Sequence, residues 1–358
     1  MSSKRRLSKK VMIIVAVVVV AVVVGIITQF VLLPLIMPPK KLKPIAVGCA
    51  MAYEQCLPVF VAISEGFYEE EGLIVKKLVS AGGGTIRTAV ISKELDFAVL
   101  GAPPFYKGVQ KGLPIKAVQV IAENNWQGFV ISTKLKDVKS FSDLKGKTFG
   151  FSSPGAGSHL FLIYLQRLHG LDPEKDVSNV PLGGDWRVWL DSYKTGKVVA
   201  SMMWEPMITW FEEEGVVKVF YDPIYIQKKL WKLERFQSNF MVLNPEIIKE
   251  KPDVIQAAIR AHVKALKWIN EHSAEEIVES GLSHPMTKQY FELIEKPLVI
   301  KCIEHIKDRG DWIKPAENGG KFDRDAIEAV AKLFVEVGIL EKEVSYDELI
   351  DPRFVGEE

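Results

Sequence analysis

The hydrophobic pattern of this chain begins with one long apolar segment. Val11 to Met37 carries no charge, and Thr28 and Gln29 are its only clearly polar side chains. A helix needs roughly 20 apolar residues to cross a bilayer, whereas the apolar core of a signal peptide has about 7–15. Lysines and arginines are frequent in the residues before it, and such positive charges keep the amino end on the cytoplasmic side of the membrane. We therefore predict a cytoplasmic tail over 1–10, a transmembrane anchor over 11–37 and a stiff linker over 38–44. A cleaved signal peptide is the alternative.

Short apolar runs alternate with helical periods through the rest of the chain. Leu73–Val79 and Leu95–Leu100 are typical of buried strands, and the apolar spacing after them is typical of helices. This alternation favours an α/β protein with mainly parallel sheets, whose ligand crevice lies beyond the carboxyl ends of the strands. The loops expected at that edge are Cys49–Gln55, Ser80–Thr85, Gly101–Pro104 and Glu123–Trp126.

The segment Lys147–His169 combines a strand, a turn and a helix in a way that suits a polar ligand. The apolar run Thr148–Phe151 breaks into the Ser/Pro/Gly turn Ser152–Gly157, and helical spacing begins near Ser158. The first N–H groups of a helix have no intrahelical partner, and the helix dipole adds about half a positive charge there. The plainer interpretation is that the glycines only make a tight turn and Ser158 only caps the helix.

Composition excludes several classes of function. The formal net charge is +1, and no basic stripe is interleaved with aromatic residues, so we expect no nucleic-acid partner. The three cysteines form no CxxC pair and the six histidines no HExxH motif, so we expect no metal and no cofactor. We expect Cys49 and Cys56 to be two separate buried thiols, although an exported location would permit a disulfide between them.

Short sequence pieces in a fixed order carry a family resemblance. The pieces are Gly66–Leu73, Glu94–Ala98, Lys111–Lys116, Phe141–Lys147, Gly155–His159, Trp204–Pro206, Val337–Leu340 and Asp351–Val355. With this order and spacing, the chain outside the apolar segment resembles the substrate-binding proteins of ABC importers in the nitrate/sulfonate/taurine family. That family includes binders of thiamine-precursor pyrimidines.

The resemblance implies a two-lobed periplasmic-binding-protein fold of the second type. Lobe I would comprise 45–133 and 238–358, and lobe II would comprise 134–237. The chain would cross between lobes near Phe129–Thr133 and Ser238–Leu243. The resemblance also implies a non-enzymatic, monomeric binding protein that serves an ABC permease and its ATPase. With the anchor, this becomes a single-pass membrane protein whose binding domain lies on the extracytoplasmic side.

Candidate ligand contacts lie in or beside the loops that follow the strands. They are small, polar or aromatic residues, namely Tyr53, Gln55, Gly84, Thr85, Ala102, Asn125, Trp126, Ser153, Gly157, Ser158, His159, Asp185, Trp186, Trp204 and Glu205. No loop offers an obvious arginine clamp, so a sulfonate- or nitrate-like anion would bind through helix N-termini and hydroxyls. A pyrimidine would instead stack on the aromatic rings and use Glu205 or Asp185. The sequence leaves both open.

Two further functions compete with that of a binding protein. A pyrimidine-forming enzyme shares the wider group, but this chain has no clustered Cys/His chemistry, and the anchor places the domain away from cytoplasmic cofactors. A ligand sensor needs a cytoplasmic output module, whereas only about ten residues precede the expected span.

Overall fold

The computed structural model describes residues 18, 21, 41–50 and 52–356. The predicted tail and anchor lie outside the described residues except for Val18 and Ala21, so the anchor stays a prediction. Among the described helices, none combines the length and the hydropathy that a membrane span requires. The chain divides into a unit over residues 1–42 and a unit over residues 43–358, and the second unit is described below.

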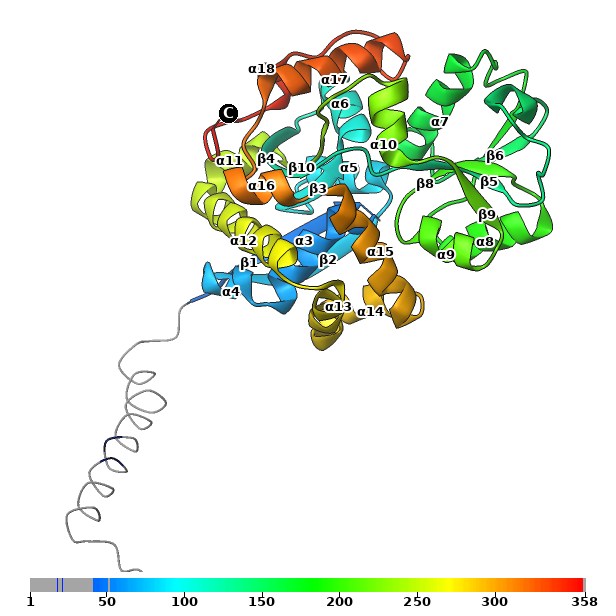
Figure 1. The fold of residues 1–358 in the computed structure, drawn as a ribbon. Coiled ribbons are helices and arrows are strands. Elements are labelled where there is room, and N and C mark those ends of the chain that lie inside the picture. The colour runs from blue at the N-terminus through cyan, green and yellow to red at the C-terminus, as the bar shows by residue number, and fades with distance from the viewer. Residues whose placement is uncertain (1–17, 19–20, 22–40, 51, 357–358) are drawn as a thin grey trace, which may run out of the picture. The chain divides into compact units, whose positions relative to one another are not determined.

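Two mixed five-stranded sheets form the framework of the second unit (Figure 1). The first has the strand order β2-β1-β3-β10-β4, with β1 Lys43–Ala50, β2 Leu73–Ala81, β3 Phe97–Gly101, β4 Lys116–Glu123 and β10 Gln237–Leu243. The second has the order β7-β6-β8-β5-β9, with β5 Gly128–Ser132, β6 Thr148–Phe151, β7 Ser178–Pro181, β8 Ala200–Met203 and β9 Val217–Tyr221. We call residues 43–123 with 237–356 lobe I, and residues 128–221 lobe II.

One strand in each sheet runs against its neighbours. β5 pairs antiparallel with β8 and β9, and β10 pairs antiparallel with β3 and β4. Both strands follow a crossing between the lobes. A chain that leaves one sheet at the carboxyl ends of its strands enters the other sheet at the facing edge. It must then run away from that edge, opposite to the parallel strands.

The crossings lie elsewhere than predicted. Phe129 pairs with Met202 and Tyr221 of lobe II, so β5 belongs to lobe II and the boundary at residue 133 is wrong. The first crossing is the loop 124–127, and the return passes over 222–236 into β10. An apolar run of five residues predicts a strand but does not show which sheet the strand joins. Only its packing partners decide that. For Phe129 these are Phe141 and Phe149, with ring centroids 4.8 and 6.3 Å away.

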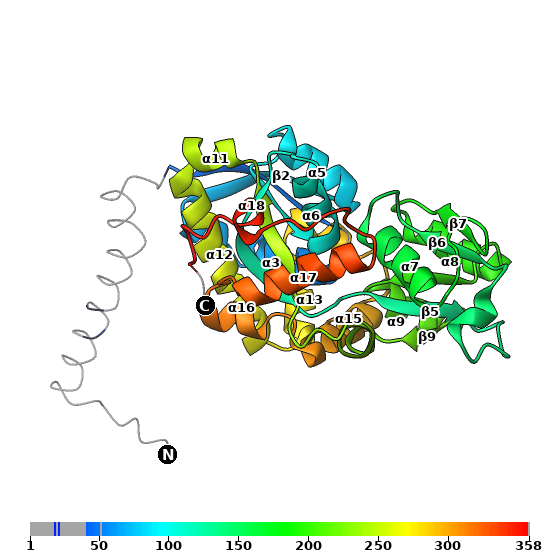
Figure 2. The ribbon, with the colours of Figure 1, turned by 90° about the horizontal axis from the view of Figure 1, so that it is seen from above.

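Helices cover both faces of each sheet. Those of lobe I are α3 Tyr53–Ser64, α4 Phe67–Glu70, α5 Gly83–Ile91, α6 Ala102–Gln110, α11 Pro245–Glu250, α12 Pro252–Glu271, α13 Ala274–Ser283, α14 Pro285–Phe291, α15 Lys296–Arg309, α16 Ile313–Asn318, α17 Arg324–Glu336 and α18 Tyr346–Leu349. Those of lobe II are α7 Gly157–Leu168, α8 Trp186–Thr195 and α9 Met207–Glu213, and α10 Pro223–Tyr225 lies on the return. In Figure 1, α7 covers one face of the second sheet and α8 and α9 cover the other, and Figure 2 shows lobe II to one side of lobe I.

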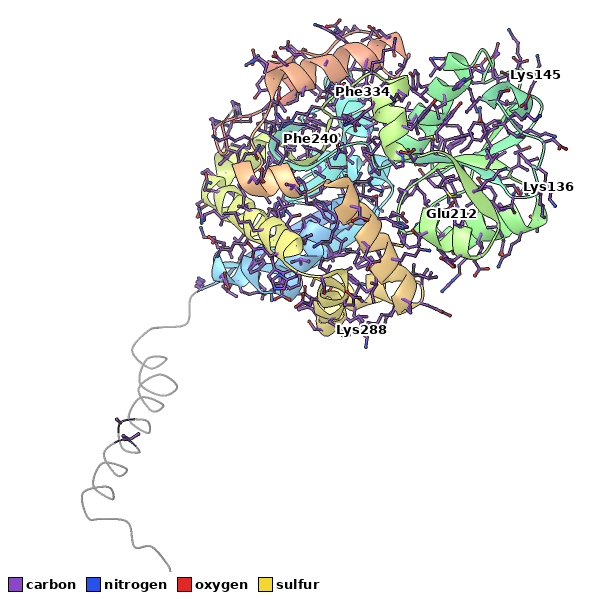
Figure 3. The ribbon with its side chains drawn as sticks, viewed as in Figure 1. Lys136, Lys145, Glu212, Phe240, Lys288 and Phe334 are labelled. Carbon is purple, nitrogen blue, oxygen red and sulfur yellow. A yellow bond between two sulfur atoms is a disulfide. The ribbon has the colours of Figure 1, made fainter. Side chains whose placement is uncertain are left out.

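The pleat of the first sheet divides the hydrophobic residues between two cores. Val47 and Val99 face a core with α3, α12 and α15, while Ala98 and Leu100 face a core with α5, α6 and α17. In the second of these cores the ring of Tyr106 lies 6.4 Å from that of Phe240 and 5.3 Å from that of Phe334, the latter two labelled in Figure 3. The sheet is therefore buried on both faces, which explains its uninterrupted apolar runs.

Two predicted loops are the first turns of helices. α3 begins at Tyr53 and α6 at Ala102, inside the expected loops Cys49–Gln55 and Gly101–Pro104. Pro103 and Pro104 are compatible with α6 because the first N–H groups of a helix need no intrahelical acceptor. The helices therefore bring their amino ends directly to the edge of the sheet.

Cys49 and Cys56 form a disulfide, with Cα atoms 5.3 Å apart, so the expectation of two separate thiols is wrong. Position 56 lies in the first turns of α3, which folds back on the end of β1 and brings the two cysteines together. Cys302, in α15, is free and buried.

Candidate functional site

A cavity of about 280 Å³ lies where the carboxyl ends of the two sheets meet. Lobe I contributes the last residues of β1 and β3, Gly82 after β2, and the first turns of α3, α5 and α6. The first crossing contributes Trp126 and Gln127. Lobe II contributes the Ser152–Ser158 turn, Gly183, Gly184, Trp186 and Trp204. The cavity is thus the predicted crevice, and it is lined by both lobes.

Helix amino ends converge on this cavity. The N-cap residues of α3, α5, α6 and α7 are Ala52, Gly82, Gly101 and Ala156, and within the described chain no side chain caps these four helices. Alanine and glycine have no side-chain acceptor, so in α5 and α7 the first N–H groups stay available to a ligand. In α3 the N–H of Tyr53 already donates to the carbonyl oxygen of Glu205, and in α6 Pro103 and Pro104 have no N–H. One helix amino end is worth about 0.3–1 kcal/mol to an exposed anion and up to about 2 when partly buried. The amino ends of α5 and α7, one from each lobe, therefore make the cavity favourable for negative charge.

Three residues of this lining also carry buried polar atoms that lack a partner. The amide oxygens of Gln55 and Gln127 and the indole nitrogen of Trp186 are buried, and none has a hydrogen-bond partner among the described residues. Gln55 and Gln127 are each 3% exposed and Trp186 is 8% exposed. A buried polar group without a partner costs about 1–3 kcal/mol. These three atoms are therefore candidates for hydrogen bonds with a ligand.

The described lining of the cavity carries no charged side chain. The lysines of lobe II that Figure 3 labels, Lys136 and Lys145, are exposed and point outward from the lobe. Attraction for an anion in this cavity therefore has to come from backbone dipoles, which need no counter-ion to be buried with them.

Trp126 closes one side of the cavity by lying on the backbone of β3. A Cβ atom added at Gly101 would come within 2.7 Å of the Trp126 ring, so only glycine permits this contact. The ring also meets Phe161 of α7, with centroids 6.1 Å apart. Trp126 thus spans both lobes at the crossing.

The Ser152–Ser158 turn is held by its own side chains. Ser152 N–H donates to Ser158 Oγ at 3.0 Å, and the two hydroxyls lie 2.8 Å apart. Gly155 N–H donates to His159 Nδ1 at 3.1 Å, and burial lowers the pKa of His159. Ser158 is therefore the second residue of α7 and not its cap, and His159 fixes the turn from outside the cavity lining.

The structure brings together about half of the predicted contacts. The cavity is lined by Gln55, Thr85, Trp126, Ser153, Gly157, Ser158, Trp186 and Trp204. Tyr53 and Asp185, with Trp186 again, line an adjoining cavity of about 340 Å³. Asp185 is also the N-cap of α8, and its Oδ1 accepts from Arg187 N–H at 2.9 Å.

Five predicted contacts do not line either cavity, namely Gly84, Ala102, Asn125, His159 and Glu205. Gly84 and Ala102 each lie one residue from a lining position. Asn125 is fully buried and joins the two crossings, since its amide nitrogen donates to the carbonyl oxygens of Gln127 at 2.7 Å and Pro223 at 3.1 Å.

Glu205 lies outside the cavity lining, and its carboxylate is paired with other residues of the protein. It is 3% exposed and accepts from Thr209 N–H at 3.1 Å and from Thr209 Oγ1 at 3.0 Å. His305 of α15 lies 3.4 Å from the same carboxylate, and this hydrogen bond raises the pKa of His305. Glu205 thus joins α9 of lobe II to α15 of lobe I.

A second buried carboxylate stands at the amino end of α3. Glu54 Oε1 accepts from Arg309 at 2.7 Å, and Arg309 also donates to Asp311 at 2.9 Å. Burial raises the pKa of Glu54 to about 8, with Arg309 opposing the shift. This cluster lies outside the described linings of both cavities, so it supports α3 without facing a ligand.

Sequence reasoning missed the small residues and Gln127. Ala50, Ala52, Gly82, Gly83 and Ala156 line the cavity with backbone, which a search for polar side chains overlooks. Gln127 follows Trp126 on the crossing, and its place just before β5 was the signal that could have found it. In the part of the chain that the structure describes, no three His, Cys, Asp or Glu residues are arranged to hold a metal ion.

Two lobes, each on a mixed sheet with a reversed strand, and a cavity between them define the periplasmic-binding-protein fold. A family model described as NMT1/THI5 like matches residues 54–276, and the chain belongs to that family. The family predicted from the sequence is thereby confirmed.

Relatives of known sequence extend over most of the chain. The putative binding protein YtlA of Bacillus subtilis (strain 168) is 23% identical over 297 residues, which are 82% of this chain and 83% of that protein. The putative aliphatic sulfonates-binding protein of the same strain is 21% identical over 240 residues, 66% of this chain and 68% of that protein. A putative thiamine biosynthesis protein of Haemophilus influenzae is 32% identical over 122 residues, 34% of this chain and 38% of that protein.

Solved structures share the fold at low sequence identity. A protein from Bordetella bronchiseptica RB50 has a TM-score of 0.71 at 20% identity, and the match covers 88% of this chain and 96% of that one. The alkanesulfonate-binding protein SsuA from Xanthomonas axonopodis pv. citri, bound to MOPS, has a TM-score of 0.63 at 15% identity, covering 86% and 97%. At these identities the likeness establishes the fold.

Proposed function

We propose that this chain is the solute-binding component of an ABC importer and captures a small sulfonate- or nitrate-like anion between its lobes. The observation that carries the proposal is the convergence of the uncapped amino ends of α5 from lobe I and α7 from lobe II on one cavity. The sulfonate-binding relative and the sulfonate-binding structural neighbour support the same class of ligand.

Capture and signalling follow from the position of the cavity. An anion can accept hydrogen bonds from N–H groups of α5 in lobe I and of α7 in lobe II. It is bound most tightly when both lobes approach it. Binding therefore shifts the population toward a closed arrangement, as in hinge-type binding proteins. A permease that recognises the closed arrangement would accept the loaded protein and reject the empty one.

The proposal includes the location of the protein. We propose that residues 11–37 tether it to the membrane and that the binding unit faces the extracytoplasmic side, where it meets the permease that the ATPase drives. The uncharged apolar segment supports the tether. The Cys49–Cys56 disulfide supports an oxidising compartment.

A thermal-shift series on the full chain in a non-ionic detergent tests the ligand class. Methanesulfonate, taurine and nitrate are compared with chloride and with an aminopyrimidine. We expect at least one of the first three to raise the Tm, because a ligand at a hundredfold excess over Kd stabilises by about 2.7 kcal/mol. Stabilisation by the aminopyrimidine alone would refute the anion proposal.

The second candidate ligand is a thiamine-precursor pyrimidine. The unpaired amides of Gln55 and Gln127 beside three tryptophan rings favour it, because they suit a flat ring with both donors and acceptors. The partial match to a putative thiamine biosynthesis protein points the same way. A Gln127→Leu variant separates the two, since a pyrimidine would lose a direct hydrogen bond while an anion would keep its backbone donors.

A further inference from the structure

Polar contacts join α15 of lobe I to α9 of lobe II, and Figure 1 shows α15 on the side of lobe I that faces lobe II. Lys301 and His305 are four residues apart on α15, so they lie on one face of this helix. Lys301 forms an ion pair with Glu213 at the end of α9. His305 Nδ1 lies 3.0 Å from Thr209 Oγ1 and 3.4 Å from Glu205 Oε1. Each of these contacts exists only while the two lobes touch.

The hydrogen bonds of this contact place one proton on His305. The hydroxyl of Thr209 has a single proton and donates it to Glu205 Oε1 at 3.0 Å. Its oxygen then accepts from His305 Nδ1, which therefore carries a proton. The side chain of His305 is 43% exposed, so a second proton can reach the ring from solvent. The ring then becomes a cation, and a charge-assisted hydrogen bond is roughly twice as strong as a neutral one.

The buried groups around this contact favour a positive charge on His305. Glu205, Glu54 and Asp311 are three buried carboxyl groups. Arg309 donates to Glu54 at 2.7 Å and to Asp311 at 2.9 Å, so its charge is shared by those two. A buried carboxylate that lacks a cation is costly. Protonation of His305 supplies a cation to Glu205.

The charged groups that face His305 differ in their effects on its pKa. The hydrogen bond to Glu205 raises this pKa above its ordinary value, while burial and the charges of Lys301 and Arg309 oppose the shift. Cys302 lies one turn away on α15, and burial raises the pKa of its thiol, so the thiol stays neutral. A histidine pKa that the lobe contact raises adds stability to that contact below about pH 6.5. This addition is lost as the pH rises through the raised pKa.

We propose that Glu205, Thr209 and His305 form a protonation-dependent latch that holds the two lobes together. Protonation strengthens a contact that is present only when α9 and α15 touch, so closing the lobes takes up a proton. The latch lies outside the described linings of both cavities and acts on the position of the lobes. A ligand that needs both lobes then binds more tightly as the pH falls toward 6. The latch does not depend on which ligand the protein binds.

Distances between spin labels on the two lobes test the latch without a ligand. The labels replace two exposed lysines shown in Figure 3, through Lys136→Cys in lobe II and Lys288→Cys in lobe I. Cys302 is buried and the other two cysteines form the disulfide, so labelling is confined to the new positions. Pulsed electron resonance on the full chain in a non-ionic detergent gives the distance distribution at a pH of about 6 and of about 8.5.

We expect the population with altered lobe separation to grow about threefold or more between the lower and the higher pH, because the latch loses its charge. A distribution that is the same at both pH values would overturn the inference. The measurement uses no ligand, so this result would leave the proposed function standing.

Two substitutions assign the response to one histidine. His305→Gln keeps a donor but does not titrate, so its distribution should be the same at both pH values. Glu54, whose pKa burial raises to about 8, is retained in this variant. A pH response that survives His305→Gln would therefore belong to another group and overturn the inference. His272→Gln is the matched control, because His272 is a half-buried histidine of lobe I whose ring stacks on Trp268 within the same lobe. It should keep the full pH response, and loss of the response in this control as well would contradict the latch.

Discussion

At the scale of single residues, the site depends on which polar atoms lack a hydrogen-bond partner within the protein. Gly157 has no side chain between its N–H and the cavity, and Gln127 has no protein partner for its amide oxygen among the described residues. Ser158, by contrast, uses its hydroxyl on Ser152. The residues that would serve a ligand are therefore those whose own hydrogen bonds are incomplete.

Substitutions at Gly157 and Ser158 should differ in their effects. A Cβ atom at Gly157 would lie 2.8 Å from Gln127 Nε2, so Gly157→Val displaces Gln127 and fills the approach to the backbone. We expect about a tenfold or greater loss of anion affinity, which is about 1.4 kcal/mol. Ser158→Ala should weaken binding less but cost about 1–3 kcal/mol of unfolding free energy, because Ser152 N–H loses its acceptor. Calorimetry measures both, and unchanged affinity in both folded variants would show that the turn only reverses the chain.

The pH dependence of stability should contain a contribution from His262. Complete burial lowers the pKa of His262 to about 3 in the folded state, where Nε2 lies 2.7 Å from Tyr68 Oη. The unfolded chain, with a histidine pKa near 6.5, binds this proton more readily. Stability should therefore fall as the pH decreases from about 6.5 toward 3. In a plot of unfolding free energy against pH, the slope across this range should be smaller for His262→Gln than for the wild type, by the equivalent of up to one bound proton. Identical slopes would contradict the assignment.

At the scale of elements, tertiary contacts set where helices begin. Pro58 lies inside α3 and cannot donate to the carbonyl oxygen of Glu54. The indole N–H of Trp312 donates to that oxygen instead, at 3.1 Å. This contact from a segment far along the chain lets α3 start at Tyr53, ahead of the proline, and bring its amino end to the cavity.

The disulfide should stabilise the connection between β1 and α3. Its cysteines are 7 positions apart, and in the chain-entropy account a loop this short is worth about 2–3 kcal/mol. The double substitution Cys49→Ser with Cys56→Ser should lower the Tm accordingly. A reductant should lower the Tm of the wild type and of Cys302→Ala, but should leave the double variant unchanged. Insensitivity of the wild type to the reductant would contradict the role of this disulfide.

At the scale of the whole molecule, the lobes are joined by more than the two crossings. Tyr53 N–H donates to the carbonyl oxygen of Glu205 at 3.3 Å, and His305 lies 3.0 Å from Thr209 Oγ1. Lys301 and Glu213 form an ion pair between α15 and α9. These contacts join the lobes behind the cavity, so a change in lobe position must break or rearrange them.

The binding unit should fold without residues 1–42. Residues 43–358 form one compact unit and contain the described hydrophobic cores of both lobes. A chain that starts at Lys43 should keep the Tm and the ligand affinity of the full chain, while the full chain should sediment with membranes. Mass spectrometry of the mature protein provides the control. An amino terminus near Pro38 or Lys41 would show that the apolar segment is a cleaved signal peptide.

Local features of the sequence determined much of this protein. Apolar runs marked most strands, because a strand buried on both faces has few polar residues. The Asp185 N-cap and the glycine turn before α7 were equally local, since caps and turns depend on neighbouring residues. Tyr53, Gln55 and the tryptophans could be placed near the cavities because they follow strand ends, which a parallel sheet gathers at one edge.

Only the tertiary structure decided which of these residues meet. β5 joined lobe II because Phe129 packs on Phe141 and Phe149, and no local pattern distinguishes the two sheets. Asn125 and Glu205 are polar residues of the kind that often contact ligands. Their hydrogen bonds are nevertheless made within the protein, with Gln127, Pro223 and Thr209. Whether a polar group keeps an unused hydrogen-bond donor or acceptor for a ligand depends on atoms far away in sequence. For that reason the cavity, the unpaired amides and the disulfide appear only when the chain is folded.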